Sequence, residues 1–84
     1  MKLNQSVQRA TAILRAAAER PAGDTASGLA RSTGLPTSTA MRLIYTLESE
    51  GFLTRQGNGR YVIGLALARL GHDAGHGDLL DATA

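Results

Sequence analysis

The chain has 84 residues, 43% of them hydrophobic, a formal net charge of +2 and no cysteine. This length allows one small domain, and the hydrophobic share is typical of a folded protein rather than a disordered one. The composition excludes a disulfide framework and a thiolate zinc site, and we expect neither a membrane-spanning nor a secretory segment, and hence a cytoplasmic protein.

The charge is unevenly distributed. Residues 1–70 hold all nine Lys and Arg residues but only four acidic residues, a formal charge of +5, whereas residues 71–84 add Asp73, Asp78 and Asp81. A basic domain favours a polyanionic partner, and the alternative is an ordinary solvated charged surface.

The first predicted helix begins at Ser6 as the cap and runs to about Arg20, where Pro21 to Asp24 end it. Its apolar residues recur at helical spacing and predict one buried stripe: Val7, Ala10, Ile13, Leu14 and Ala17.

Two short helices joined by a tight turn follow. The second is expected from Ala26 to Ser32 with Thr25 as its cap, although Gly28 inside it is less favourable than Ala by about 1 kcal/mol. The turn is Gly34–Pro36, and the third helix runs from Pro36 or Thr37 to about Ser49, with Gly51 as its stop. We expect the helices to meet through apolar residues: Leu29, Ala30, Leu35, Ala40, Leu43, Ile44 and Leu47. This pattern is typical of a helix-turn-helix.

A β-hairpin comes next. The runs 52–56 and 60–63 alternate in the manner of strands and flank Gly57-Asn58-Gly59, a tight-turn signal. After Gly64, residues 65–70 begin a helix, and the glycines of residues 71–77 indicate a linker. The predicted fold is mostly α with a small β-hairpin. It is a winged helix-turn-helix over residues 1–70, with a three-helix core, a wing and a linker helix, and residues 71–84 form a linker.

From Ser6 to Gly71 the chain resembles the DNA-binding domain of the IclR family of bacterial transcription regulators. The resemblance rests on Ser6–Ala10 with Ile13-Leu14, Leu29–Arg31, Gly34–Thr39 with Arg42-Leu43, Gly59–Tyr61, and Ile63–Leu65 leading to Leu70-Gly71. It implies homodimers and a separate C-terminal domain that binds a small-molecule effector. That domain is missing here, so we expect a truncated fragment whose last residues lead toward it. Thr37 stands where the family often has a basic residue, and Gly28 stands near a common acidic position.

The predicted function is therefore sequence-specific binding of double-stranded DNA, with repression as the expected outcome. Recognition helices touch bases with their first turns, which here hold Thr37, Ser38 and Thr39. Arg42 lies further along the same face and can pair with guanine or with a phosphate. The alternative for Thr39 is to point inward or toward a phosphate, and we expect Tyr45 to contact a phosphate rather than the core.

In the wing, Arg60 follows the glycine-rich tip and can enter the minor groove or bind its phosphates, and Arg55 across the hairpin is a phosphate partner. Arg31 can meet the DNA backbone or be solvated. Arg42 and Arg60 are expected to be exposed, so that their removal changes stability by no more than about 0.5 kcal/mol. Leu65, Leu67 and Leu70 are expected to help pair two chains on a near-palindromic operator.

Other functions fit the sequence less well. His72 and His76 have zinc-like spacing, but the surrounding glycines disfavour a rigid helix, so no metal or other cofactor is expected. Ser, His and Asp occur without a nucleophile elbow, so we expect no enzyme. The alternatives are a winged-helix dimerisation module of an enzyme such as a methyltransferase, and the winged helix of another regulator family.

Overall fold

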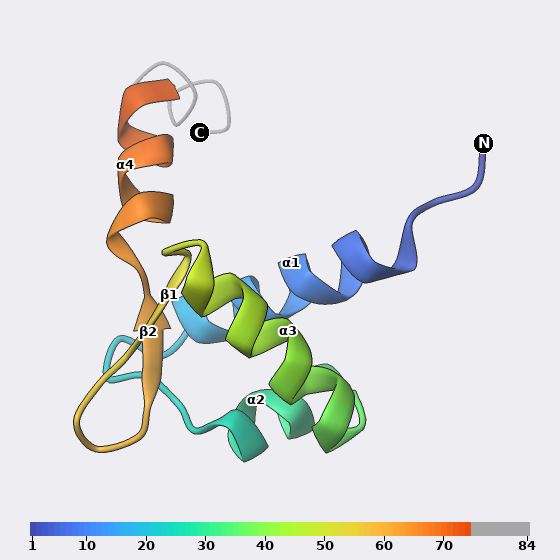
Figure 1. Cartoon of the computed structure of the whole chain (residues 1–84), viewed down its shortest axis with the longest axis horizontal. Coiled ribbons are helices and arrows are strands. Elements are labelled where there is room, and N and C mark those ends of the chain that lie inside the picture. The colour runs from blue at the N-terminus through green and yellow to red at the C-terminus, as the bar shows by residue number, and fades with distance from the viewer. Residues whose placement is uncertain (75–84) are drawn as a thin grey trace.

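The computed structural model describes residues 1–74. This part of the chain contains α1 (Gln5–Ala18), α2 (Ala26–Thr33), α3 (Thr37–Ser49), β1 (Leu53–Arg55), β2 (Tyr61–Ile63) and α4 (Leu65–Ala74). In Figure 1 the first three helices form the body, the β1–β2 hairpin lies along one side of it, and α4 projects away from the hairpin. The predicted winged helix-turn-helix, mostly α with a small hairpin, is confirmed.

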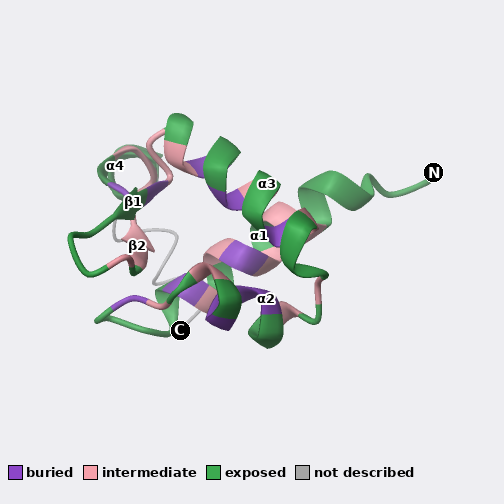
Figure 2. Ribbon diagram, turned by 60° about the horizontal axis from the view of Figure 1, so that its bottom comes forward, coloured by how far each residue is buried: buried purple, intermediate pink, exposed green. Residues whose placement is uncertain are grey.

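The core lies where α1, α2 and α3 meet, and Figure 2 shows their buried segments facing one another. Its largest fully buried side chains are Ile13, Leu29, Ile44 and Leu53, one from each of α1, α2, α3 and β1. Small buried residues, Ala17, Ala30 and Ala40, let the helices approach closely. The predicted helix contacts are therefore confirmed, although Val7, at the start of the predicted stripe, is 60% exposed.

The first helix begins and ends earlier than predicted. Its N-cap is Asn4, whose side chain accepts a hydrogen bond from the Val7 N–H at 3.1 Å, so Ser6 lies inside the first turn and is not the cap. Asn is as good a cap as Ser, and the two residues lie close together in the sequence, so the local pattern did not separate them.

The turn of the helix-turn-helix follows the prediction. Thr25 caps α2 by accepting the Gly28 N–H at 3.0 Å. Gly34 ends α2 with a φ of +72°, and the Leu35 N–H donates to the Ala30 carbonyl at 3.0 Å. This closure requires the left-handed conformation that glycine adopts without strain. Gly51, with a φ of +78°, ends the third helix in the same way.

The hairpin is antiparallel, with Leu53 opposite Ile63 and Arg55 opposite Tyr61. It also pairs with the segment between α1 and α2, which the sequence analysis did not predict. The Tyr61 N–H donates to the Asp24 carbonyl at 2.7 Å, and the Asp24 N–H donates back to Tyr61 at 3.2 Å. Backbone pairing on both sides of β2 therefore fixes the wing against the body.

The fourth helix is longer than predicted. It begins at Leu65 as expected but continues through Gly71 to Ala74, so the expected boundary at residue 70 falls inside a helix. None of its residues is buried, and Leu65 and Leu70 are 63% and 53% exposed. His72 lies on this helix, whereas His76, Asp78 and Asp81 lie outside the described residues. Within residues 1–74 there is no group of potential metal ligands and no helix able to span a membrane.

Candidate nucleic-acid interface

The N-terminus of α3 is open. Its N-cap is Pro36, which makes no side-chain capping bond, and its first turn contains no acidic residue. The first N–H groups of a helix carry its positive end and attract anions and hydrogen-bond acceptors. Thr37 and Ser38 lie beside these groups, are exposed, and do not cap the helix, so their hydroxyls are available to a ligand.

One face of α3 points outward. Ser38, Arg42 and Tyr45 are exposed and lie about one turn apart, opposite the buried Ala40, Ile44 and Leu47. Tyr45 is 74% exposed and does not belong to the core, and its contact with a phosphate stays a prediction. Thr39 is half-buried and faces α1 across a groove.

Met41 is 46% exposed on the same helix and was not predicted to lie at the surface. Its apolar side chain suggested no surface role. The available signal was its position four residues after Thr37 and four before Tyr45, both of which were already expected at the surface.

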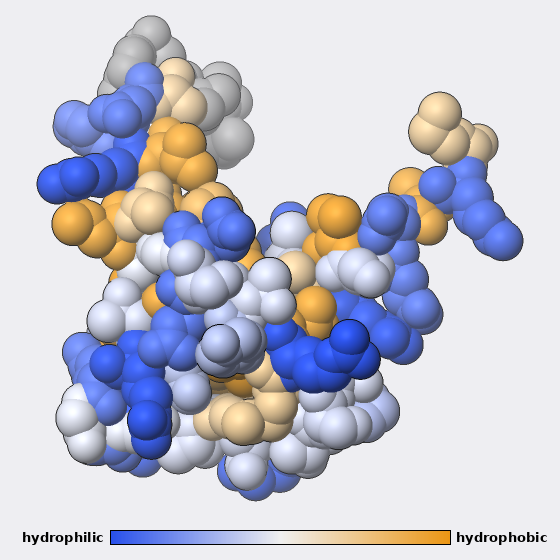
Figure 3. Space-filling view, in the orientation of Figure 1, coloured by the Kyte–Doolittle hydropathy of each residue, from blue (hydrophilic) through white to orange (hydrophobic). Residues whose placement is uncertain are grey.

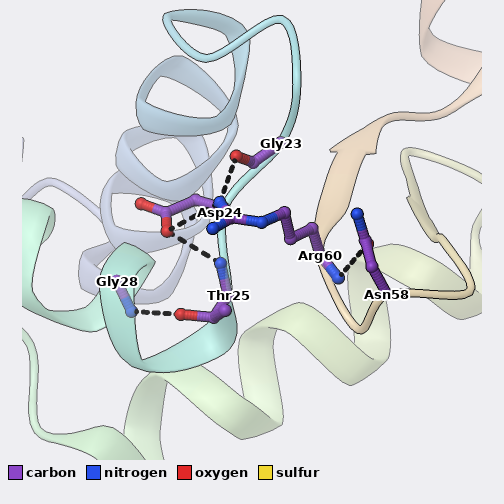
Figure 4. A network of polar contacts seen from close by, with 6 residues as sticks. All are labelled: Gly23, Asp24, Thr25, Gly28, Asn58 and Arg60. Carbon is purple, nitrogen blue, oxygen red and sulfur yellow. Dashed lines mark hydrogen bonds and ion pairs between the residues drawn. The ribbon is translucent and has the colours of Figure 1, made fainter.

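The two arginines of the wing have different surroundings. Arg55 ends β1 and is exposed. Arg60 turns back toward the connection between α1 and α2: its Nη1 donates to the Gly23 carbonyl at 3.1 Å and lies 4.0 Å from Asp24 Oδ1, as Figure 4 shows. Arg60 is exposed, as expected, but its contacts with Gly23 and Asp24 were not predicted.

The Asp24 side chain contacts the start of α2 and lies near Arg60. Its Oδ1 accepts the Thr25 N–H at 2.8 Å, and its side chain is only 13% exposed. A Cβ added at Gly28 would overlap the Asp24 carboxylate, so the glycine inside α2 is explained by the space that this carboxylate occupies.

A groove separates α1 from α3 and brings further polar side chains together. It is lined by Ser6, Arg9, Thr39, Arg42, Leu43 and Thr46. In Figure 3 hydrophilic side chains gather over the region where these two helices meet. Arg31, exposed in the last turn of α2, and the wing arginines are not part of this groove. Arg9 and Ser6 were not among the predicted site residues, although the position of Arg9 off the apolar stripe indicated exposure.

Comparison with known proteins gives consistent results. The model of the IclR helix-turn-helix domain matches residues 6–57. The chain is 44% identical over 70 residues to the glycerol operon regulatory protein of Streptomyces coelicolor. The aligned region covers 80% of this chain and 27% of that protein.

Two solved structures have the same fold. An IclR transcriptional regulator from Alicyclobacillus acidocaldarius superposes with a TM-score of 0.80 at 28% identity, covering 88% of this chain and 30% of that one. An IclR homologue from Microbacterium hydrocarbonoxydans, complexed with 4-hydroxybenzoate, gives 0.73 at 29% identity over 79% of this chain and 28% of that one. This chain thus spans less than a third of each of these relatives.

The matched segment contains α2, the turn, α3, β1 and all but the first residue of α1. The chain therefore belongs to the IclR family of transcriptional regulators and carries the DNA-binding helix-turn-helix domain of that family.

Proposed function

We propose that this domain binds a specific sequence of double-stranded DNA by placing α3 in the major groove. The observation that carries the proposal is the outward face of α3, where hydroxyls and a guanidinium follow an uncapped helix N-terminus. Hydroxyl and guanidinium groups suit the donor and acceptor pattern of base edges in the major groove.

Each predicted site residue has a role in this arrangement. Thr37, Ser38 and Arg42 contact base edges, and the Thr37 methyl group can meet a thymine methyl. Thr39, Tyr45 and Arg31 contact the DNA backbone, which fixes the position of α3 without reading sequence. Arg55 contacts a phosphate beside the wing, and Arg60 reaches the minor groove after leaving the Gly23 carbonyl.

In the whole protein, the domain acts as the DNA-reading part of a dimeric repressor that a small-molecule effector controls. Support comes from relatives: one is named for regulation of an operon, and a solved homologue is complexed with a small aromatic acid. The effector binds in a domain outside this chain, and two-fold pairing makes the operator near-palindromic. Repression follows when the dimer occupies a promoter and blocks polymerase.

A dimerisation module of an enzyme such as a methyltransferase is the alternative. Such a module has no need of an exposed guanidinium and hydroxyls on α3, and its outward face would be apolar. The polar face of α3 and the regulator relatives favour DNA binding.

The test is selection of tight binders from random duplexes, followed by fluorescence anisotropy with Arg42→Ala and the control Arg15→Ala. Both arginines are exposed on helices, but Arg15 lies outside the α1–α3 groove. We expect Arg42→Ala to weaken binding by about 1–3 kcal/mol and to relax preference at one base position. Arg15→Ala should bind almost as the wild type does.

Salt provides a second readout. The +5 charge of residues 1–70 predicts that log affinity falls steeply with log salt concentration, by roughly 0.9 for each neutralised phosphate. Failure to enrich any duplex, or affinity independent of salt, would contradict the proposed function.

A further inference from the structure

We propose that the groove between α1 and α3 holds one backbone phosphate of the bound duplex, with Arg9 of α1 as its main ligand. This inference rests on the proposed DNA binding and adds a site from outside the helix-turn-helix. It also assigns α1, which otherwise serves the core, a part in holding DNA.

The first argument is the composition of the groove. One arginine comes from each helix, Arg9 from α1 and Arg42 from α3, and three hydroxyl residues also line the groove: Ser6, Thr39 and Thr46. No acidic side chain lines it. Guanidinium and hydroxyl donors around a space without carboxylates match the chemistry of a phosphate group.

The second argument is the uncompensated charge. The ion pair found within residues 1–74 is that of Arg60 with Asp24, so Arg9 and Arg42 have no carboxylate within 4.0 Å in this part of the chain. Two like charges on the walls of one groove raise the local positive potential. A bound anion between them relieves this repulsion.

The third argument concerns the hydroxyls. Thr46 Oγ1 donates to the Arg42 carbonyl at 2.8 Å, so its hydrogen is already used inside the helix. The hydroxyls of Ser6 and Thr39 donate to no protein group among residues 1–74. Both can therefore donate to a phosphate oxygen in the groove.

The position of the groove identifies the source of the phosphate. Arg42 belongs both to the groove and to the outward face of α3 that we assign to the bases. A helix seated in the major groove is flanked by the sugar–phosphate backbone, so a groove bordering that face meets a phosphodiester. Arg9 is also half-buried, so its side chain loses less freedom on binding than a fully exposed arginine would.

The assignment separates the two arginines by function. Arg9, facing a phosphate, contributes affinity that does not depend on base sequence, and Arg42, facing bases, contributes preference. The test compares Arg9→Gln with Arg15→Gln, which makes the same change at an exposed position of the same helix outside the groove.

Affinities for the selected duplex and a scrambled duplex are measured by anisotropy over a range of salt concentrations. We expect R9Q to lose about tenfold in affinity for both duplexes at low salt and to reduce the salt slope by about 0.9 for each bound chain. R15Q should change the slope by less than half as much. Circular dichroism tests whether both variants fold. If R9Q does not fold, Arg9→Lys, which keeps the charge, takes its place in the comparison.

A neutral methylphosphonate placed at each backbone position in turn locates the contact. At one position in each half-site, the methylphosphonate should weaken binding by the wild type and have no further effect on R9Q. If R9K replaces R9Q, the methylphosphonate should weaken its binding less than that of the wild type. If every position weakens both proteins equally, or if R9Q behaves as R15Q does, the phosphate site is overturned while DNA binding stands.

Inorganic phosphate in solution is the other ligand whose chemistry fits the groove. If inorganic phosphate binds the wild type but not R9Q, and leaves the affinity of the wild type for the duplex unchanged relative to chloride at equal ionic strength, the groove binds a free anion and the assignment to DNA is overturned. If the wild type binds no duplex at all, the proposed function fails first and this inference fails with it.

Discussion

At the scale of single residues, the corner around Asp24 explains an unusual choice inside a helix. The Asp24 carboxylate receives the Thr25 N–H, lies near the Arg60 guanidinium and occupies the space where a side chain at Gly28 would begin. Glycine in a helix interior is less favourable than alanine by about 1 kcal/mol. The carboxylate makes that loss necessary, because an alanine here would force Asp24 away from Thr25.

We therefore expect strong energetic coupling between positions 24 and 28. In the wild-type background, Gly28→Ala should give no gain in stability, because the higher helix propensity is offset by displacement of Asp24. In the Asp24→Ala background the space is open, and the same change should stabilise the domain by about 1 kcal/mol. Thermal unfolding of the four proteins measures this, since about 1 kcal/mol corresponds to roughly 4–8 °C for a domain of this size.

The contradicting result is equally specific. If Gly28→Ala raises the unfolding temperature by the same amount in both backgrounds, the Asp24 carboxylate does not restrict position 28. The glycine would then need another explanation.

Residue-scale predictions succeeded where the deciding contacts are local. Thr25, Gly34 and Gly51 were identified because a cap or a left-handed turn depends on residues a few positions away. The hydrogen bond of Arg60 was not predicted, because it goes to Gly23, 37 residues away in the sequence. Nothing in the pattern around Arg60 indicates that contact.

At the scale of elements, local pairing within the hairpin could be predicted, but its pairing with the segment between α1 and α2 could not. The β1–β2 hairpin could be predicted from its turn residues, but pairing of Asp24 with Tyr61 depends on how α1 and α2 pack. For the site, α3 and its outward face were predicted from spacing alone. The α1–α3 groove was not, because its two walls come from helices separated by α2.

The fourth helix has an apolar surface that the described chain does not cover. It contacts the body near its start, where the Ala66 N–H donates to the Gly51 carbonyl at 3.2 Å, but Leu65 and Leu70 remain largely exposed. Apolar side chains over this helix are visible in Figure 3. Exposed apolar patches on small domains commonly mark contact with another chain.

We therefore expect the double variant Leu65→Gln and Leu70→Gln to weaken self-association at least tenfold while the domain stays folded. Arg69→Gln, on the same exposed helix, is the matched control and should associate as the wild type does. Sedimentation equilibrium over a range of protein concentrations measures the monomer–dimer constant. Equal association of the double variant and the wild type would show that α4 does not pair the chains.

At the scale of the whole molecule, the small core and the basic charge both favour association with another macromolecule. A domain of this size buries a low fraction of its surface, so a partner chain would add stability, and its excess of positive charge would attract a polyanion. A symmetric pair joined through α4 would satisfy both tendencies, because two copies of α3 would then meet the same duplex.

This arrangement predicts the symmetry and the spacing of the operator. Two-fold pairing places equivalent helices on one side of the DNA, so the selected sequence should be a near-palindrome with half-sites about 10 base pairs, or a multiple of that, apart. Inserting about half a helical turn between the half-sites should abolish tight binding, because it moves one half-site to the opposite side of the duplex, whereas a full turn restores the facing. Sedimentation of the complex gives the stoichiometry directly. Two chains per operator at saturation are expected, and one chain per operator, or tight binding that ignores the half-turn insertion, would contradict the paired arrangement.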